Sequence, residues 1–173
     1  MSMKRHSFWG WVGAIWGFAG VALLLGFAIY RLTPLAVTAL EMPLTGLQWT
    51  VLVVFVLFMA FSEGYRGFQK AFSPRVAARA RYLRANPTPT RVLLAPFFCM
   101  AYFDAPRRRR IAAYALTLGV ILLVVLVHQL DQPWRGIIDA GVVIGLAWGL
   151  LATFVFWIQA LTRPEFGVSP EVA

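Results

Sequence analysis

The sequence predicts an all-α, polytopic membrane protein with four transmembrane helices and a basic, partly helical cytoplasmic loop between helices two and three. Three observations predict this fold class. The 173 residues are 60% hydrophobic and only 13% charged, whereas a soluble domain carries about 25% charged residues. Four uncharged apolar runs reach the length of about 18–20 residues that a bilayer-spanning helix needs. All of the net positive charge lies between the second and third of these runs.

The four apolar runs predict four spans in a single membrane domain that covers residues 1–173. The first run is too long for the apolar core of a cleaved signal peptide, which takes about 7–15 residues. We therefore expect it to be retained as a span. The expected spans are residues 8–30, 43–62, 111–130 and 137–161.

The distribution of charge predicts the orientation of these spans. Residues 63–110 contain 11 basic residues and only two acidic ones, Glu63 and Asp104, so this segment carries the whole formal charge of +9. Loops rich in Lys and Arg remain in the cytoplasm. We therefore expect a cytoplasmic loop at 63–110 and both termini in the cytoplasm. The preference for arginine and alanine is typical of a GC-rich bacterial gene, which suggests a multi-pass protein of the bacterial cytoplasmic (inner) membrane.

The predicted loop has helical structure of its own. Aromatic residues at 61, 65, 68 and 72 follow at helical spacing, so we expect the second helix to continue to about Phe72. Ser73 and Pro74 then indicate an N-cap and the first position of a new helix. The two prolines of residues 86–89 end that helix. The apolar segment 92–103 is too short to span a membrane and is typical of an interfacial or re-entrant segment.

The cations of this loop are candidate binding residues for anions. Arginine forks bind phosphate or carboxylate in a bidentate manner, and basic clusters beside a membrane bind anionic headgroups. The alternative, that these side chains only set the topology, stays open. No nucleic-acid-binding motif is present, so nucleic acid is not an expected partner. The candidate anion- and lipid-binding residues are Arg66, Lys70, Arg75, Arg79, Arg81, Arg84, Arg107, Arg108, Arg109 and Arg110.

Two spans carry glycine stripes that favour close helix packing. Small residues let helix backbones approach in a membrane, where lipid provides no hydrophobic drive for association. The stripes indicate packing within one chain, of the first span on the fourth, and the alternative is a homo-oligomer interface. The residues of these stripes are Gly10, Gly13, Gly17 and Gly20 in the first span, and Gly141, Gly145 and Gly149 in the fourth.

Ionisable residues near membrane depth are few. His128 ends the third span and Asp139 begins the fourth, and a short connector places both near the outer surface, where they could form an ionisable pair. The alternative is that each contacts headgroup water. No catalytic, cofactor or metal site is expected, because the sequence lacks a cluster of ligand residues and has only one cysteine, Cys99.

Three functions are compatible with these features, and a non-catalytic role is favoured without excluding an enzyme. The leading hypothesis is an accessory, assembly or scaffold subunit that packs through its glycine faces. Its expected partners are anionic lipid headgroups, a protein or a second copy of itself. The second hypothesis is a small transporter or channel with an outer ionisable site at His128 and Asp139. The third is a phospholipid-binding or lipid-modifying protein.

Overall fold

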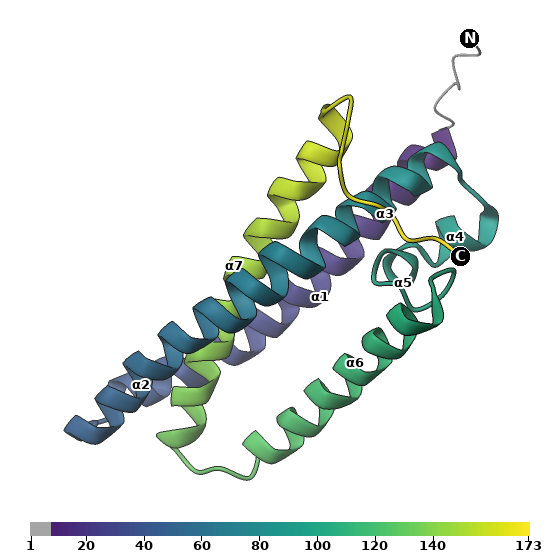
Figure 1. Cartoon of the computed structure of the whole chain (residues 1–173). Helices are drawn as coiled ribbons and strands as arrows, with labels where there is room; N and C mark the ends of the chain where they lie inside the picture. The colour runs from purple at the N-terminus through teal and green to yellow at the C-terminus, as the bar shows by residue number, and fades with distance from the viewer. Residues whose placement is uncertain (1–7) are drawn as a thin grey trace.

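The computed structural model describes residues 8–173, and the regular secondary structure of these residues is helical throughout (Figure 1). The all-helical prediction is therefore confirmed. The predicted location of the N-terminus concerns residues outside the described range. The elements are α1 (Phe8–Glu41), α2 (Gly46–Met59), a π-helical segment η1 (Ala60–Phe72), α3 (Ser73–Ala85), α4 (Pro89–Leu93), α5 (Ala95–Cys99), α6 (Arg107–Val127) and α7 (Trp134–Thr162).

Four helices are long and apolar enough to cross a membrane: α1, the continuous helix Gly46–Ala85, α6 and α7. Their ends differ from the expected span limits because a charge ends an apolar run without ending a helix. Helix α1 continues past Arg31 and contains Pro34. The second helix begins only after Thr45, whose side chain and Gln48 form a capping box.

The second helix runs through Ser73 without a break, so the prediction of a new helix capped by Ser73 is wrong. Ser73 has helical backbone angles, and its side chain makes no capping bond. Its hydroxyl instead lies 2.8 Å from the hydroxyl of Thr153 on α7. A buried serine needs such a partner, and α7 supplies it across the interface.

The π-helical segment η1 sets which residues of the second helix face α7. Met59, Glu63 and Phe68 lie against Gly141, Gly145 and Gly149 in turn. The glycines recur every four residues, whereas their partners are four and then five residues apart. A π-helix bonds i to i+5 and so has more residues per turn than an α-helix. This wider turn keeps the three side chains on one face, which we call the α7 seam.

A regular α-helix would place other residues on this seam. Positions seven and eleven residues after Met59 share its face at the α-helical period, and they are Arg66 and Lys70. In η1 both cations are exposed. The expected single aromatic face also divides, because Phe68 lies on the seam while Phe61 is 57% exposed.

The glycine stripe of α1 packs against α3, α4 and α5 rather than against α7 as expected. A Cβ at Gly10 would overlap the backbone of Arg84, and one at Gly17 would lie 2.7 Å from the sulfur of Cys99. Helix α1 meets α7 through other residues, including Phe18, whose ring stacks on Trp157 at 4.5 Å between centroids. The main core therefore lies at one end, between α1, α3 and α5. Its buried residues are Val21, Leu25, Val76, Ala80, Leu83, Ala95, Phe98 and Cys99.

Helix α6 stands apart from the other three long helices (Figure 1). It makes almost no close contact with any of them, and Val127 is its only buried residue. Its large aliphatic side chains are exposed on every side, with Leu118 at 66% and Leu122 at 60%. The protein thus consists of a body of α1, α2–α3 and α7, with α6 beside it.

We predict that Gly10→Ala destabilises the body whereas Gly26→Ala in the same helix does not. The added methyl group at Gly10 would meet the main chain of Arg84, which has little freedom to move, while a Cβ at Gly26 meets nothing within 4 Å. Overpacking of this kind costs about 1–3 kcal/mol. Thermal unfolding in detergent should show a lower midpoint only for Gly10→Ala, and equal midpoints for the two variants would contradict the packing.

Candidate functional site

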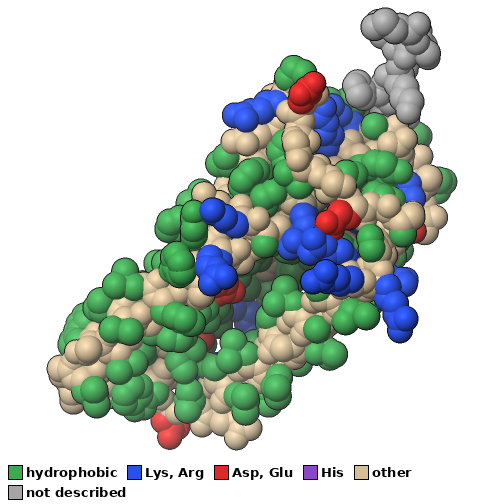
Figure 2. Space-filling model, in the orientation of Figure 1, with side chains coloured by type: hydrophobic (Ala, Val, Ile, Leu, Met, Phe, Trp, Pro, Cys, Tyr) green, Lys and Arg blue, Asp and Glu red, His purple; other side chains and the backbone are tan. Residues whose placement is uncertain are grey.

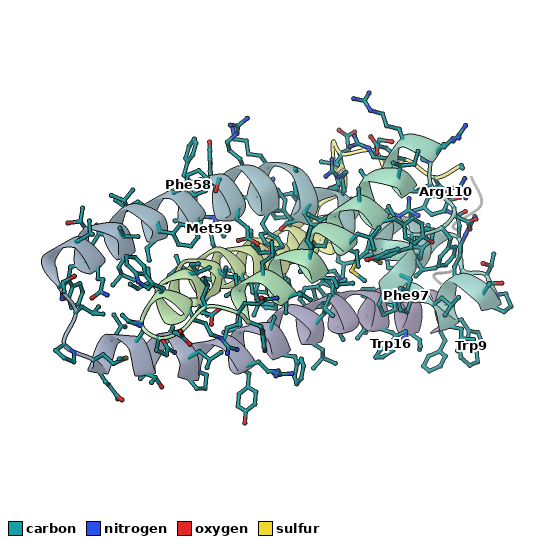
Figure 3. The ribbon with its side chains drawn as sticks, turned by 90° about the horizontal axis from the view of Figure 1, so that it is seen from below. Trp9, Trp16, Phe58, Met59, Phe97 and Arg110 are labelled. Carbon is teal, nitrogen blue, oxygen red and sulfur yellow. The ribbon has the colours of Figure 1, made fainter. Side chains whose placement is uncertain are left out.

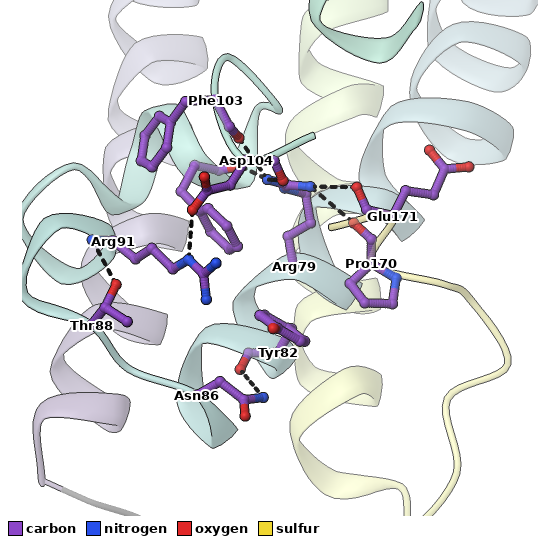
Figure 4. A network of polar contacts seen from close by, with 10 residues as sticks. Arg79, Tyr82, Asn86, Thr88, Arg91, Phe103, Asp104, Pro170 and Glu171 are labelled. Carbon is purple, nitrogen blue, oxygen red and sulfur yellow. Dashed lines mark hydrogen bonds and ion pairs between the residues drawn. The ribbon is translucent and has the colours of Figure 1, made fainter. Parts of the chain in front are cut away.

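The candidate site is the end of the body that holds α3, α4, α5, the first turn of α6 and the C-terminal tail 163–173. Residues 63–110 contain eleven basic residues, and all of them except Arg66 lie in these segments or one turn before them. We therefore call this part of the protein the basic end. Arg79 lies at its centre and is only 2% exposed. Figure 4 shows its guanidinium surrounded by main-chain oxygens from other segments.

All five N–H groups of Arg79 donate hydrogen bonds to backbone carbonyls. Nε donates to Phe98 at 2.6 Å. A guanidinium has five N–H donors, so none remains for a ligand. The group also lies over the ring of Phe98, 4.1 Å from its centroid. The other four acceptors are Pro170 and Glu171 for Nη1, and Phe103 and Asp104 for Nη2, at 3.0–3.1 Å.

Two of these acceptor residues adopt left-handed backbone conformations. Asp104 and Glu171 have positive φ angles of 48° and 46°. Such left-handed residues persist where their surroundings hold them. Here each carbonyl accepts a hydrogen bond from a buried cation, and hydrogen bonds to charged groups are worth about 1.5–3 kcal/mol. The bonds to Arg79 therefore help to hold both turns.

Arg81 and Arg84 bind the C-terminal end of α7. Arg81 donates to the carbonyls of Ala160 at 3.1 Å and Arg163 at 2.9 Å, and Arg84 donates to Leu161 at 3.2 Å. The last carbonyls of a helix lack partners within the helix and carry partial negative charge. These two guanidiniums therefore satisfy the end of α7 and join it to α3.

Two ion pairs complete the basic end. Arg91 binds Asp104 at 2.7 Å. Arg109 binds both carboxylate oxygens of Glu171, with Nη2 to Oε1 at 2.9 Å. The second pair connects the start of α6 to the C-terminal tail.

The remaining candidate cations are available for a ligand. Within residues 8–173 their side chains make no hydrogen bond or ion pair, and all except Arg75 are exposed. Anion binding by these residues stays a prediction. The six are Arg66, Lys70, Arg75, Arg107, Arg108 and Arg110.

The structure does not bring His128 and Asp139 into direct contact. Arg135 lies between them, with Nη2 3.2 Å from His128 Nε2 and Nε 3.8 Å from Asp139 Oδ2. His128 is exposed and Asp139 is 4% exposed. The cluster is at the opposite end of α7 from the basic end, and the sequence analysis missed Arg135 as its third member. Its spacing four residues before Asp139 is the pattern of a helical ion pair.

Glu63 is a second residue whose position the sequence analysis missed. It was expected at the start of the loop, but it lies on the α7 seam, where a Cβ at Gly145 would be 2.8 Å from its Oε2. That oxygen is buried and has no hydrogen-bond partner among the described residues. Its spacing of four residues from Met59 puts both on one helix face, a signal that the division into span and loop at residue 63 concealed.

Cys99 is an unsuitable nucleophile in this setting. It is buried against α1, and burial raises the pKa of its thiol to about 12. A nucleophilic cysteine needs a lowered pKa and access to substrate. Within residues 8–173 no group of three or more His, Cys, Asp or Glu residues could hold a metal ion.

We predict that Arg79→Lys destabilises the protein although it keeps the charge. A lysine ammonium has three donors, so it leaves some of the five buried carbonyls unpaired, at a cost of at least about 2 kcal/mol. The thermal midpoint in detergent should fall and protease should cleave the tail faster, because two of the five acceptors lie at 170–171. Arg163→Lys, an exposed change, is the control. Unchanged cleavage of the Arg79 variant would contradict this role.

We predict that the C-terminal tail loosens at acidic pH. The hydrogen bond from Arg109 lowers the pKa of Glu171, so the pair stabilises the docked tail at neutral pH and this contribution is lost as pH falls through the lowered pKa. A nitroxide on Ala173→Cys should be immobile at neutral pH and gain mobility as pH falls through the lowered pKa of Glu171, with buried Cys99 unlabelled. Adding Glu171→Gln should make the label mobile at both pH values, and an immobile label in that variant would refute the mechanism.

Comparison with protein families, with curated proteins and with solved structures finds no match for this chain. The function is therefore argued from the contacts above. Those contacts divide the cations of the basic end into a set that binds the chain itself and a set that faces outward.

Proposed function

We propose that this chain is a non-catalytic accessory, assembly or scaffold subunit of the bacterial cytoplasmic membrane. The observation that carries the proposal is the separation of the basic residues into two sets. Arg79, Arg81 and Arg84 bind backbone carbonyls and make the basic end one structured unit. A further six cations make no hydrogen bond or ion pair within the described chain, which leaves them available for anionic groups outside it.

The proposed orientation places the basic end and both termini in the cytoplasm. Segments rich in Lys and Arg stay on that side of the membrane. Aromatic side chains support a membrane interface at this level, because Trp and Tyr gather at headgroup depth. Trp9 and Trp16 of α1 are 62% and 46% exposed, and Figure 3 shows them with Phe97 at the same end as Arg110.

The proposed partner surfaces are the free cations and α6, rather than the glycine stripes. The stripes of α1 and α7 are already filled by side chains and backbone of the same chain. Helix α6 offers exposed aliphatic side chains on all sides, and its first turn carries three of the free cations. A partner with acidic residues beside its own span would match both features.

Extraction into native-lipid nanodiscs followed by native mass spectrometry tests this function. We expect a species heavier than one chain, and we expect Arg107→Gln, Arg108→Gln and Arg110→Gln together to reduce it several-fold, since charge-assisted contacts at the first turn of α6 would be lost. The matched control is Arg135→Gln, at the other end of α7. Cysteine accessibility must show unchanged orientation in each variant. A single chain carrying only lipid in every preparation would refute the proposal.

A further inference from the structure

A gap separates α6 from the body over most of its length. Figure 2 shows a hollow between α6 and the other helices, with hydrophobic side chains along its sides and lysine and arginine side chains gathered above it. The large side chains of α6 are unpacked all round the helix, with Leu116 at 63% and Ile121 at 55% exposed, so whichever of them face this space are uncovered. In a bilayer such a space is filled by lipid chains or by another apolar helix.

The composition of α6 favours lipid chains over a helix. Helices pack closely in membranes through small residues, and the only glycine of α6 is Gly119, whose surroundings are empty within 4 Å. The stripe glycines of α1 and α7, from Gly10 to Gly20 and from Gly141 to Gly149, are already covered by the chain itself. A gap with branched aliphatic walls instead suits flexible acyl chains, which adapt to irregular surfaces.

The chemistry at the basic end of this gap favours an anionic headgroup. Arg75 of α3 has Arg109 and Glu171 as its charged neighbours. Both oxygens of Glu171 are bound by Arg109, so the half-buried Arg75 guanidinium has no hydrogen-bond partner within residues 8–173. Glu171 therefore neutralises Arg109 at the start of α6, while no carboxylate of the described residues pairs with Arg75. A phosphodiester there would offset the excess charge.

We propose that the space between α6 and the body binds an anionic glycerophospholipid, with its phosphate on Arg75 and Arg109 and its acyl chains along α6. Arg75 offers a free guanidinium fork, which matches phosphate geometry. Arg109 uses Nε and Nη2 on Glu171 and keeps Nη1 for the phosphate. The inference rests on the membrane placement given under Proposed function. Arg75 and Arg109 can bind a lipid phosphate only if the basic end lies at the depth of the headgroups.

Native mass spectrometry of the detergent-purified full chain tests the site with phosphatidylglycerol, phosphatidylcholine and inorganic phosphate as separate probes. We expect the protein to retain phosphatidylglycerol at a lipid concentration about tenfold lower than it needs for phosphatidylcholine. An affinity difference of this size is what a charge-assisted hydrogen bond to the headgroup would provide. Arg75→Gln should remove most of that preference, and Arg75→Lys should restore part of it. Arg163→Gln, an exposed cation at the end of α7, is the matched control.

Several outcomes would overturn the site. Equal retention of the two lipids, or an equal effect of Arg75→Gln and Arg163→Gln, would show that no anionic lipid is selected there. Displacement of the lipid by millimolar phosphate would assign the site to the free anion instead. A dimer mass with no lipid would assign the gap to a second copy. Arg75 makes no contact that the fold needs, so an unchanged thermal midpoint should confirm that the variant is folded. Loss of lipid preference with partner binding intact would separate failure of this site from failure of the scaffold function.

Discussion

The buried guanidinium of Arg79 is the constraint on which the basic end depends. A cation removed from water is tolerated only when its donors are paired, and here the five acceptors come from α5, the turn after it and the C-terminal tail. These segments lie up to 92 residues from Arg79 in the sequence. Pairing the cation therefore docks all three on α3, while the glycines of α1 let α3 and α5 approach closely.

The π-helical segment has the complementary effect on the exposed cations. By widening the turn of the second helix, it presents Phe68 as well as Glu63 to the glycines of α7 and turns Arg66 and Lys70 outward. The glycine stripe can then be covered by bulky side chains at close range. The result is a body whose glycine stripes are covered and whose unpaired cations are mostly exposed.

Sequence reasoning predicted the helical class and the four long apolar helices, because lipid-compatible length and composition are local properties. It misplaced helix ends at Arg31 and Ser73, since hydropathy describes the surroundings of a segment and backbone hydrogen bonding continues past a charge or a serine. It recognised both glycine stripes, and α1 does pack on α7, but the stripe of α1 faces α3, α4 and α5 instead of that contact. A smooth face shows that something packs closely on it without identifying the partner.

The same distinction applies to the arginines. The sequence by itself determined that a charge of +9 lies in residues 63–110, between the second and third apolar runs. Only the tertiary structure decided which guanidiniums are used within the fold and which stay free. The alanines beside Arg79 hint at close packing, but identical side chains at neighbouring positions differ in role according to whether a carbonyl from a distant segment reaches them. That contact is created by folding, and local sequence does not contain it.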